Sequence, residues 1–268
     1  MAEHWHSLVA NFAVVALFIS TWVHGQFVLN THPRWHKRLA FGAVMGLGAV
    51  ASMLLAIPID GALFDLRLSL IAIAGFFGGP IAGAVAVVIA AAYRLGVVGG
   101  SAASAAVLSI SLMAVIGWAV SRATRHTVPA IASVVLLSLA PLVVSLVLNQ
   151  TLHAVVGLPL TPLSQPVALL NVAATALSAF FIMRYRVIER ERDLLRAAFL
   201  NSPDFQYVKT RDSRFAAVNL AVARHHGFRE PAEMLGKSDL DLAPGERGRR
   251  LFDAEQQVLR SGEAMTDV

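Results

Sequence analysis

Two arginines, Arg67 and Arg94, lie within the most apolar part of this 268-residue chain. Between residues 39 and 121 the only other formal charges are two aspartates. Placing a guanidinium in a bilayer costs about 2.5–3.5 kcal/mol on insertion scales, so such residues usually face a cavity, a partner or a ligand. Gly78-Gly79-Pro80 lies midway between the arginines and would break a helix there. Folding back at this point would bring the arginines together and form a site for a carboxylate- or phosphate-sized anion within a membrane protein.

The arginines also have a purely structural interpretation. Arg67 could pair with Asp65, and both arginines could extend to the outer membrane interface. We favour ligand binding because both flank one helix breaker and a Gly-Gly-Ser turn. Other polar residues expected at the same depth are weaker candidates, since a lone Asn or Ser in a span more often holds helices together. These additional ligand-binding candidates are Tyr93, Ser101, Ser104, Asn149 and Asn171.

The composition divides the chain into a membrane part and a polar part. Hydrophobic residues make up 56% of the sequence, and the mean hydropathy of +0.64 lies outside the soluble globular range. Residues 1–183 carry 7 Lys/Arg and 3 Asp/Glu, whereas residues 184–268 carry 15 and 14. We therefore expect an integral membrane part that ends at Met183-Arg184 and precedes a soluble part of ordinary polarity.

Several kinds of chemistry are excluded or disfavoured. The chain has no cysteine, which excludes disulfides and thiolate metal sites. The histidines lack a carboxylate or second histidine at helical spacing inside a span, so we expect no metal site. The net charge of +5 lies mostly at the expected membrane edges, so it does not indicate a nucleic-acid partner. We expect no cofactor and no catalytic residue in these 268 residues.

Five apolar runs are long enough to cross a hydrocarbon core of roughly 30 Å, which takes about 20 helical residues. The first run has no basic segment before it and no small-residue cleavage site after it, so we expect a retained span rather than a signal peptide. A sixth apolar stretch, Leu66–Leu95, is too long for one span and contains the Gly-Gly-Pro breaker. The five predicted spans are Leu8–Val28, Leu39–Ile57, Ala102–Val120, Val128–Leu148 and Pro166–Met183.

The basic loops predict the topology, because Lys and Arg are enriched on the cytoplasmic side. Three connections are basic, and the remaining two carry two acids and no base. Placing all basic segments inside requires an external N-terminus and an apolar sixth stretch that enters and leaves at the outer face. That stretch is then a hairpin, either re-entrant or barely spanning, whereas a straight helix would separate the arginines by about 40 Å. The basic segments are residues 34–38, 122–125 and 184–192.

The segment Arg184–Leu200 continues the last span as a charged amphipathic helix, with apolar residues every three to four positions. A helix of this kind that leaves a membrane is expected to pair with its copy in a homodimer and to pass helix shifts onward. A solvated linker is the alternative.

The last part of the chain has the pattern of a small mixed domain. Alternation predicts a hairpin of Phe205–Lys209 and Arg214–Val218. Two short helices at 219–226 and 231–235 follow, then a longer helix that ends near Arg260 and a strand over Glu263–Val268. Because no strand follows as a partner, we expect the sheet to be incomplete.

Four ordered motifs resemble the five-transmembrane sensor domain of the LytS-YhcK type. They are Asp65-Leu66-Arg67, Gly78-Gly79-Pro80, Tyr93-Arg94-Leu95 and Gly99-Gly100. The resemblance covers most of residues 7–186. It implies a bacterial receptor placed before a histidine kinase or a diguanylate cyclase, with a membrane fold like the substrate-binding components of vitamin transporters. The arginine-bearing motifs of that family correspond to Arg67 and Arg94.

The chain after the amphipathic helix is similar to a PAS domain, except that the final two strands are absent. The similarity rests on Asn201–Phe205, Tyr207–Lys209, Asp212, Arg214-Phe215, Val218-Asn219, Gly227-Phe228 and Leu235–Asp239. We therefore expect a membrane all-α protein of five spans plus a broken hairpin, with its N-terminus outside, followed by a truncated α+β PAS domain. The expected domains are residues 1–186 (sensor), 184–200 (signalling helix) and 201–268 (PAS).

The expected function is a receptor in the bacterial inner membrane that senses an external small anion and relays it to a cytoplasmic output. The resemblance implies a diguanylate cyclase as that output, or a histidine kinase, and neither catalytic motif occurs in these residues. The expected partners are a carboxylate-like ligand, membrane lipids and a second copy of the chain. A transporter-type substrate-binding component and a ligand-free membrane anchor are the alternatives.

Overall fold

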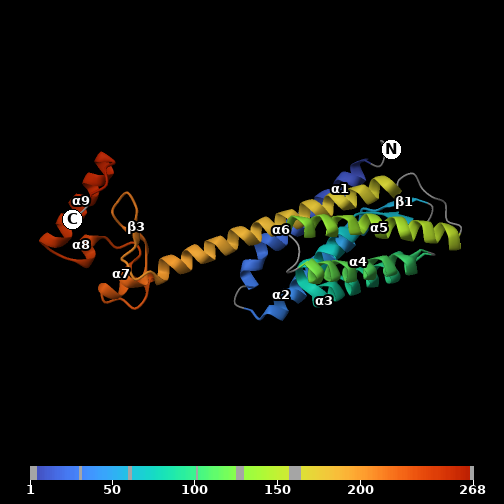
Figure 1. The fold of residues 1–268 in the computed structure, drawn as a ribbon, viewed down its shortest axis with the longest axis horizontal. Helices are drawn as coiled ribbons and strands as arrows, with labels where there is room; N and C mark the ends of the chain where they lie inside the picture. Colours follow the sequence, from blue (N-terminus) through green and yellow to red (C-terminus); the bar gives the residue numbers. More distant parts are fainter. Residues whose placement is uncertain are drawn as a thin grey trace. The chain divides into compact units, whose positions relative to one another are not determined.

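The computed structural model describes residues 5–29, 32–59, 62–100, 102–124, 130–156 and 164–265 (Figure 1). The chain forms two compact units, residues 1–185 and 186–268, which we describe separately.

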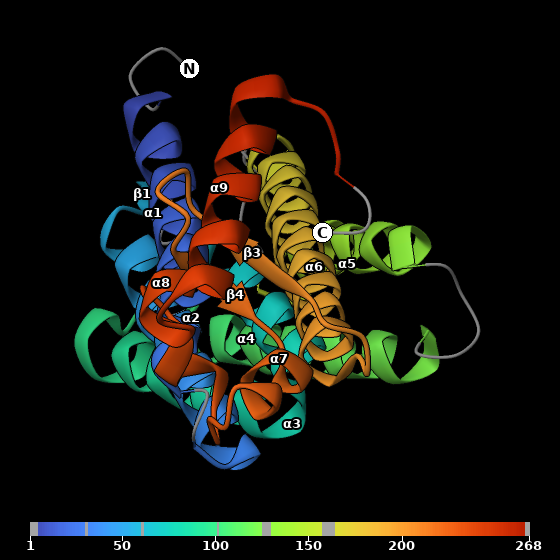
Figure 2. The ribbon, with the colours of Figure 1, turned by 90° about the vertical axis from the view of Figure 1, so that its left-hand side faces the viewer.

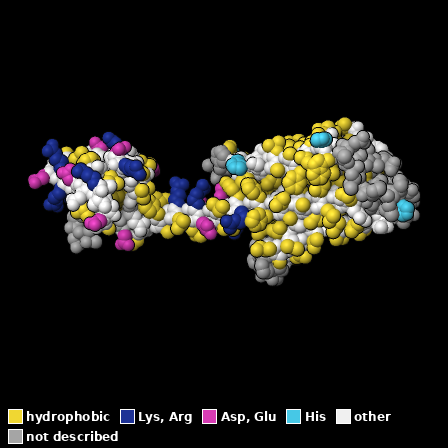
Figure 3. All heavy atoms as spheres, turned by 90° about the horizontal axis from the view of Figure 1, so that it is seen from above, with side chains coloured by type: hydrophobic (Ala, Val, Ile, Leu, Met, Phe, Trp, Pro, Cys, Tyr) yellow, Lys and Arg dark blue, Asp and Glu magenta, His cyan; other side chains and the backbone are white. Residues whose placement is uncertain are grey.

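Helices make up almost all of the first unit. Within the described residues, six helical segments have the length and apolar composition needed to cross a membrane; one of them is the segment Arg67–Val98, described below. On the face shown in Figure 3, the surface of this unit is mostly hydrophobic side chains, as expected for a protein in lipid. The helices are α1 (Trp5–Gly25), η2 (Gln26–Leu29), α2 (Arg34–Leu54), α3 (Arg67–Tyr93), the π-helical turn η3 (Arg94–Val98), α4 (Ala103–Thr124), α5 (Ala130–Val156) and α6 (Ser164–Asn201).

Helix α3 is a hairpin of two arms. Gly79 has φ 75° and ψ −164°, a conformation essentially confined to glycine, and Pro80 follows it. A Cβ placed on Gly83 would lie 3.5 Å from the Cα of Gly75. Residues eight positions apart in a continuous helix are about 12 Å apart, so the two arms fold back on each other. The hairpin predicted from the Gly-Gly-Pro breaker is confirmed.

Small residues allow α3 to pack closely against α2 and α4, its most extensive neighbours. A Cβ on Gly42 of α2 would lie 2.6 Å from the carbonyl oxygen of Ala82 in the second arm. A Cβ on Gly117 of α4 would lie 2.4 Å from the carbonyl oxygen of Ala72 in the first arm. Neither position has room for a side chain, so glycine sets the separation of these backbones.

The first unit has two distinct ends. Leu8 of α1, Ile57 of the short strand β1 (Ile57–Ile59) and Val167 of α6 form one apolar cluster at the first end. Strand β2 (Ala62–Phe64) pairs antiparallel with β1 at this end and leads into α3. The opposite end has the start of α2, the end of α4 and Arg184, where the basic segments gather.

Several boundaries differ from those expected. Helix α2 begins directly after Pro33 and ends at Leu54, because the chain then forms the β1–β2 hairpin, which the apolar pattern did not reveal. Helix α5 continues to Val156 rather than ending at residue 148. Helix α6 runs without interruption from the last span through the amphipathic segment to Asn201, as the continuous pattern predicted.

The second unit is a small mixed domain (Figure 2). Strands β3 (Tyr207–Lys209) and β4 (Phe215–Val218) form the predicted antiparallel hairpin. The side chain of Asn219 accepts a hydrogen bond from the Val222 amide and caps the helix that follows. The helices are α7 (Leu220–His225), η4 (Pro231–Met234), α8 (Asp239–Leu242) and α9 (Glu246–Ser261). Their small core consists of Phe215, Val218, Val222, Ala223 and Met234.

The strand predicted over Glu263–Val268 was wrong for the residues that the structure describes. Gly262, in the left-handed conformation, ends α9, and residues 263–265 form no strand. An isolated extended segment leaves its backbone groups unpaired, so it has no reason to persist as a strand. Residues 266–268 lie outside the described residues.

Candidate functional site

The hairpin of α3 places Arg67 and Arg94 at the same end of the first unit. Arg67 is the first residue of α3, and Arg94 begins η3, directly after the second arm. The two side chains are 8% and 2% exposed, and Asp65, two residues before Arg67, is 5% exposed. The three charges are close enough to act on one another. The structure therefore brings together the two arginines that the sequence separates by 27 positions.

Asp65 neutralises Arg67. The Nη1 of Arg67 donates to Asp65 Oδ2 at 2.5 Å, and the backbone N–H of Arg67 donates to Asp65 Oδ1 at 3.0 Å. A charge-assisted pair of this kind, with both groups buried, holds the first turn of α3 in place. This is the structural role considered above for Arg67.

Arg94 has no such counter-charge among the described residues. Its Nη1 donates to the carbonyl oxygen of Gly99 at 2.6 Å, which fixes the guanidinium against the end of η3. Gly99 has a positive φ of 61°, which turns its carbonyl back toward the helix end. Among the described residues, the buried cluster of Asp65, Arg67 and Arg94 therefore has two positive charges and one negative charge.

Each arginine also retains a buried donor. The Nε atoms of Arg67 and Arg94 are inaccessible to solvent and have no hydrogen-bond partner among the described residues. Buried donors are nearly always satisfied, so two unpartnered Nε–H groups in one cluster are unusual. Together with the excess positive charge among the described residues, they suit an anion with at least two oxygens.

Asn171 of α6 is buried beside this cluster. Its Nδ2 donates to the carbonyl oxygen of Asp65 at 3.0 Å, and its Oδ1 accepts from Ser69 Oγ at 2.9 Å. Asn171 was predicted as a ligand-binding candidate from its expected depth in the membrane. It contacts the turn that holds Arg67 rather than the arginines themselves.

A second set of polar contacts fixes the same turn from α1 and α2. Ser52 Oγ accepts from the backbone N–H of Leu66 at 3.0 Å and donates to Asn11 Oδ1 at 2.5 Å. Asn11 Nδ2 in turn donates to the carbonyl oxygen of Leu55 at 2.8 Å. We did not predict a role for Asn11, Ser52 or Ser69 from the sequence. Asn11 could have been recognised as the one asparagine within the first predicted span, Leu8–Val28.

Of the remaining candidates that the structure describes, Tyr93 and Ser104 have no polar contact with the described residues of the cluster. Tyr93 is half-buried and packs against the apolar core, and Ser104 is exposed in the first turn of α4. Ser101 lies outside the described residues, as does the side chain of Asn149.

The two described cavities are elsewhere in the first unit. They have volumes of about 350 Å³ and 260 Å³ and lie between α1 and α6, lined almost entirely by apolar side chains such as Phe12, Leu170 and Phe181. Their chemistry suits acyl chains rather than an anion. Within the described residues, no group of three His, Cys, Asp or Glu is placed to hold a metal ion.

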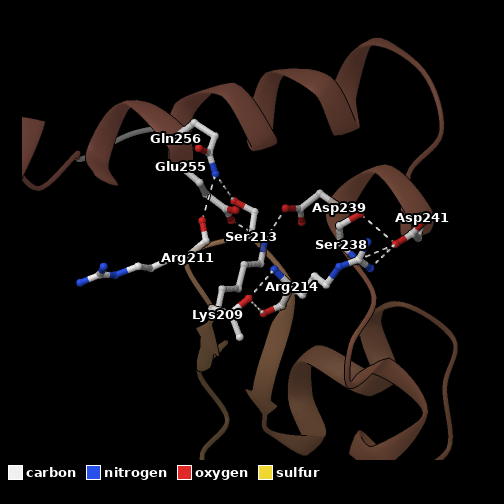
Figure 4. A network of polar contacts seen from close by, with 10 residues as sticks. Lys209, Arg211, Ser213, Arg214, Ser238, Asp239, Asp241, Glu255 and Gln256 are labelled. Atoms are coloured by element: carbon white, nitrogen blue, oxygen red, sulfur yellow. Dashed lines mark hydrogen bonds and ion pairs between the residues drawn. The ribbon is translucent and has the colours of Figure 1, made fainter. Parts of the chain in front are cut away.

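The second unit has its own partly buried cation. Lys209 Nζ forms ion pairs with Asp239 of α8 and Glu255 of α9, and it lies 4.2 Å from the ring centroid of Phe215 (Figure 4). Gln256 Nε2 donates to Ser213 Oγ at 3.0 Å alongside. These contacts attach α8 and α9 to the β3–β4 hairpin, so their role is to hold the small domain together.

Comparison with known families covers both units. Residues 21–185 match the family model described as 5TMR of 5TMR-LYT, and residues 199–268 match the model of the PAS fold. Neither the curated proteins nor the solved structures gave a match. The arginine cluster lies within the first matched region, and the Lys209 cluster lies within the second.

Proposed function

The chain belongs to the 5TMR of 5TMR-LYT family, and from that premise we propose that it is a membrane receptor for a small anion bound by Arg67 and Arg94. A membrane sensor role follows from this family together with the PAS fold. The observation that carries the ligand proposal is the buried cluster with one excess positive charge and two unpartnered Nε donors. A bound anion would neutralise the charge and satisfy the donors.

The charge balance favours a monocarboxylate. Asp65 and one monoanion together balance the two positive charges of Arg67 and Arg94, whichever arginine each of them contacts. A dianion such as phosphate would bring a second negative charge into a region that already contains the Asp65 carboxylate. Like charges in a buried site repel strongly, so phosphate would bind well only if Asp65 moved away or was protonated.

The proposed signal is a population shift. An anion that engages the free edge of Arg67 competes with Asp65 for the guanidinium and changes the packing of the first turn of α3. Helix α6 continues from the membrane span into the second unit, so a shift at its start can be passed along one element.

The orientation is also a proposal. The basic segments gather at the end of the first unit opposite the β1–β2 hairpin, which supports a cytoplasmic location for that end. The arginine cluster then opens toward the outside of the bacterial inner membrane, and the PAS unit lies in the cytoplasm. Such a receptor would report an external anion.

The proposed output is a diguanylate cyclase, with a histidine kinase as the alternative, because the resemblance of the membrane part is to receptors with those partners. The present residues include neither catalytic motif. The role of this chain is therefore sensing and relay, and the PAS unit transmits the change rather than catalysing a reaction.

The function is tested by thermal unfolding of the detergent-purified chain with acetate, lactate, succinate and inorganic phosphate. We expect a monocarboxylate to raise the unfolding temperature of the wild type and of Arg122→Met, a control at the opposite end, but not of Arg94→Met. Stabilisation that survives Arg94→Met would contradict the site. No stabilisation by any anion would favour the ligand-free anchor. Uptake of labelled ligand by vesicles would favour the transporter component.

A further inference from the structure

Polar contacts near the start of helix α6 connect it to the turn before α3. Apart from Val167 and Ile182, the buried residues of α6 are small or polar, and grooves of about 350 Å³ and 260 Å³ lie between α6 and α1. Helices in a bilayer gain little from apolar burial against each other, so close packing and hydrogen bonds decide where they lie. The small or polar buried residues of α6 include Ala168, Asn171, Ala174, Thr175 and Ser178.

The polar contacts converge on Asn171. Its Nδ2 donates to the carbonyl oxygens of Asp65 (3.0 Å) and Val167 (3.1 Å). Ser69 Oγ approaches both its Oδ1 (2.9 Å) and its backbone oxygen (3.0 Å). The side-chain amide of Asn171 therefore uses both of its N–H donors and one acceptor lone pair. Two of these three hydrogen bonds, those with Asp65 and Ser69, connect α6 to the start of α3.

Asp65 is shared between the arginine site and α6. Its carboxylate pairs with Arg67, whereas its carbonyl oxygen accepts from Asn171. The next residue, Leu66, is held by Ser52 of α2. Any ligand that draws Arg67 away from Asp65 must alter the turn that α6 is bonded to, while α2 continues to hold the turn from the other side.

We propose that Asn171 is the coupling residue that transmits the state of the Asp65–Arg67 pair to α6. This inference rests on the proposed function for its physiological trigger, the anion, but the coupling itself can be measured without a ligand. Asn171 positions α6 and does not touch the anion. Its loss should leave binding intact and disconnect binding from the movement of the helix.

The test uses the natural absence of cysteine, which leaves introduced thiols as the only labelling sites. Spin labels are attached at Val115→Cys on α4 and Leu177→Cys on α6, both exposed positions. The distance between them is measured by pulsed electron paramagnetic resonance in the full chain. Asp65→Asn removes the carboxylate charge and imitates the state in which Arg67 is released.

We expect Asp65→Asn to shift the label distance by several ångströms, Asn171→Ala to abolish that shift, and Ser178→Ala to leave it unchanged. Ser178 is a matched control, a buried polar residue two turns further along the same face of α6. Should Asp65→Asn prevent folding, Ser69→Ala removes the hydroxyl that donates to the Oδ1 and backbone oxygen of Asn171, and it must also shift α6. An equal shift with and without Asn171, or no shift in either variant, overturns the proposal.

Measurements with added acetate or lactate distinguish a failure of this inference from a failure of the proposed function. Acetate or lactate should stabilise Asn171→Ala to unfolding as strongly as the wild type, within about threefold in apparent affinity, without moving the labels. A loss of binding in Asn171→Ala would mean that Asn171 belongs to the anion site, contrary to the proposal. Absence of binding in the wild type would reject the proposed function but leave the Asp65→Asn measurement decisive for the coupling.

Discussion

Arg67 and Arg94 carry the same guanidinium, but their surroundings give them different tasks. Arg67 is paired with a buried carboxylate, whereas Arg94 donates to a backbone carbonyl and has no acidic partner among the described residues. Removing one member of a buried ion pair leaves the other charge uncompensated, which costs far more than removing an unpaired charge. The same substitution should therefore change the stability of the ligand-free protein differently at the two arginines.

Arg67→Met should lower the free energy of unfolding by about 3–5 kcal/mol, because it leaves Asp65 buried without a counter-charge. Arg94→Met should leave the ligand-free stability unchanged or raise it, while abolishing stabilisation by anions. Thermal and denaturant unfolding in detergent would measure both. If Arg94→Met destabilised the protein as much as Arg67→Met, then Arg94 would be structural and the excess charge would not be a ligand site.

Asp241 provides a prediction about pH in the second unit. The backbone N–H and hydroxyl of Ser238 both donate to its carboxylate at 2.8 Å and hold the pKa of Asp241 below its ordinary value of 3.8. A lowered pKa in the folded state means that the stabilisation is complete above 3.8 and is lost as the pH falls through the lower value.

We expect Asp241→Asn to speed hydrogen exchange of the peptide around α8 at pH 6, relative to the wild type, and to have a smaller effect at pH 3, where more of the wild-type Asp241 carboxyl is protonated. Mass spectrometry of the intact chain after exchange would measure this. The exposed carboxylate of Asp253 on α9 provides a control, and Asp253→Asn should match the wild type at both values. A difference at pH 3 as large as at pH 6 would show that the carboxylate charge is not responsible.

At the scale of elements, the α3 hairpin is what makes the arginine cluster. Its turn depends on Gly79, whose φ of 75° and ψ of −164° exclude side chains, and its depth in the bundle depends on Gly117 of α4. Without the turn, Arg67 and Arg94 would lie at opposite ends of one helix. The two glycines act differently, since the first supplies a backbone conformation and the second supplies space.

Gly79→Ala should destabilise the protein by about 1–3 kcal/mol, the usual cost of such backbone strain. Gly117→Ala should cost about as much through overpacking, since its Cβ would meet the Ala72 carbonyl oxygen at 2.4 Å. Gly25 has open space and an ordinary φ, so Gly25→Ala serves as the control and should be neutral. Unfolding midpoints of the three variants would check this, and equal midpoints would refute the role of the glycines.

At the scale of the molecule, α6 is the element common to both units. Beyond the membrane span it exposes large apolar side chains, including Leu194 at 70% and Leu195 at 72%. They follow Val187 and Ile188 by seven residues, the repeat of a two-stranded coiled coil. We propose that two copies of the chain associate along this face, which would connect the two receptors of a dimer.

Single cysteines test the association, because the chain has none of its own. Under mild oxidation, Leu194→Cys or Leu195→Cys should form an intermolecular disulfide at least several times faster than Asp193→Cys or Arg196→Cys on the opposite side of the helix. Non-reducing electrophoresis of membranes would measure the rates. Equal rates on both sides would indicate a solvated monomeric helix.

Most of the fold follows from local pattern. The apolar runs predicted the spans, the breaker predicted the α3 hairpin, and alternation with turn residues predicted β3 and β4, because each signal reflects the conformation of adjacent residues. The pattern failed at the β1–β2 hairpin, which lies between two spans and resembles the end of one. It also failed at residues 263–265, the described part of the strand predicted over Glu263–Val268, where no other strand lies alongside in the described residues.

The candidate site divides in the same way. The sequence by itself determined that Arg67 and Arg94 are costly in a membrane and that Gly78-Gly79-Pro80 could bring them together. Only the tertiary structure decided that Asp65 compensates one arginine and not the other, and that Asn171, more than 100 residues later, is bonded to the same turn. Counter-charges and hydrogen bonds between distant segments depend on how helices pack, and no local pattern of residues encodes that choice.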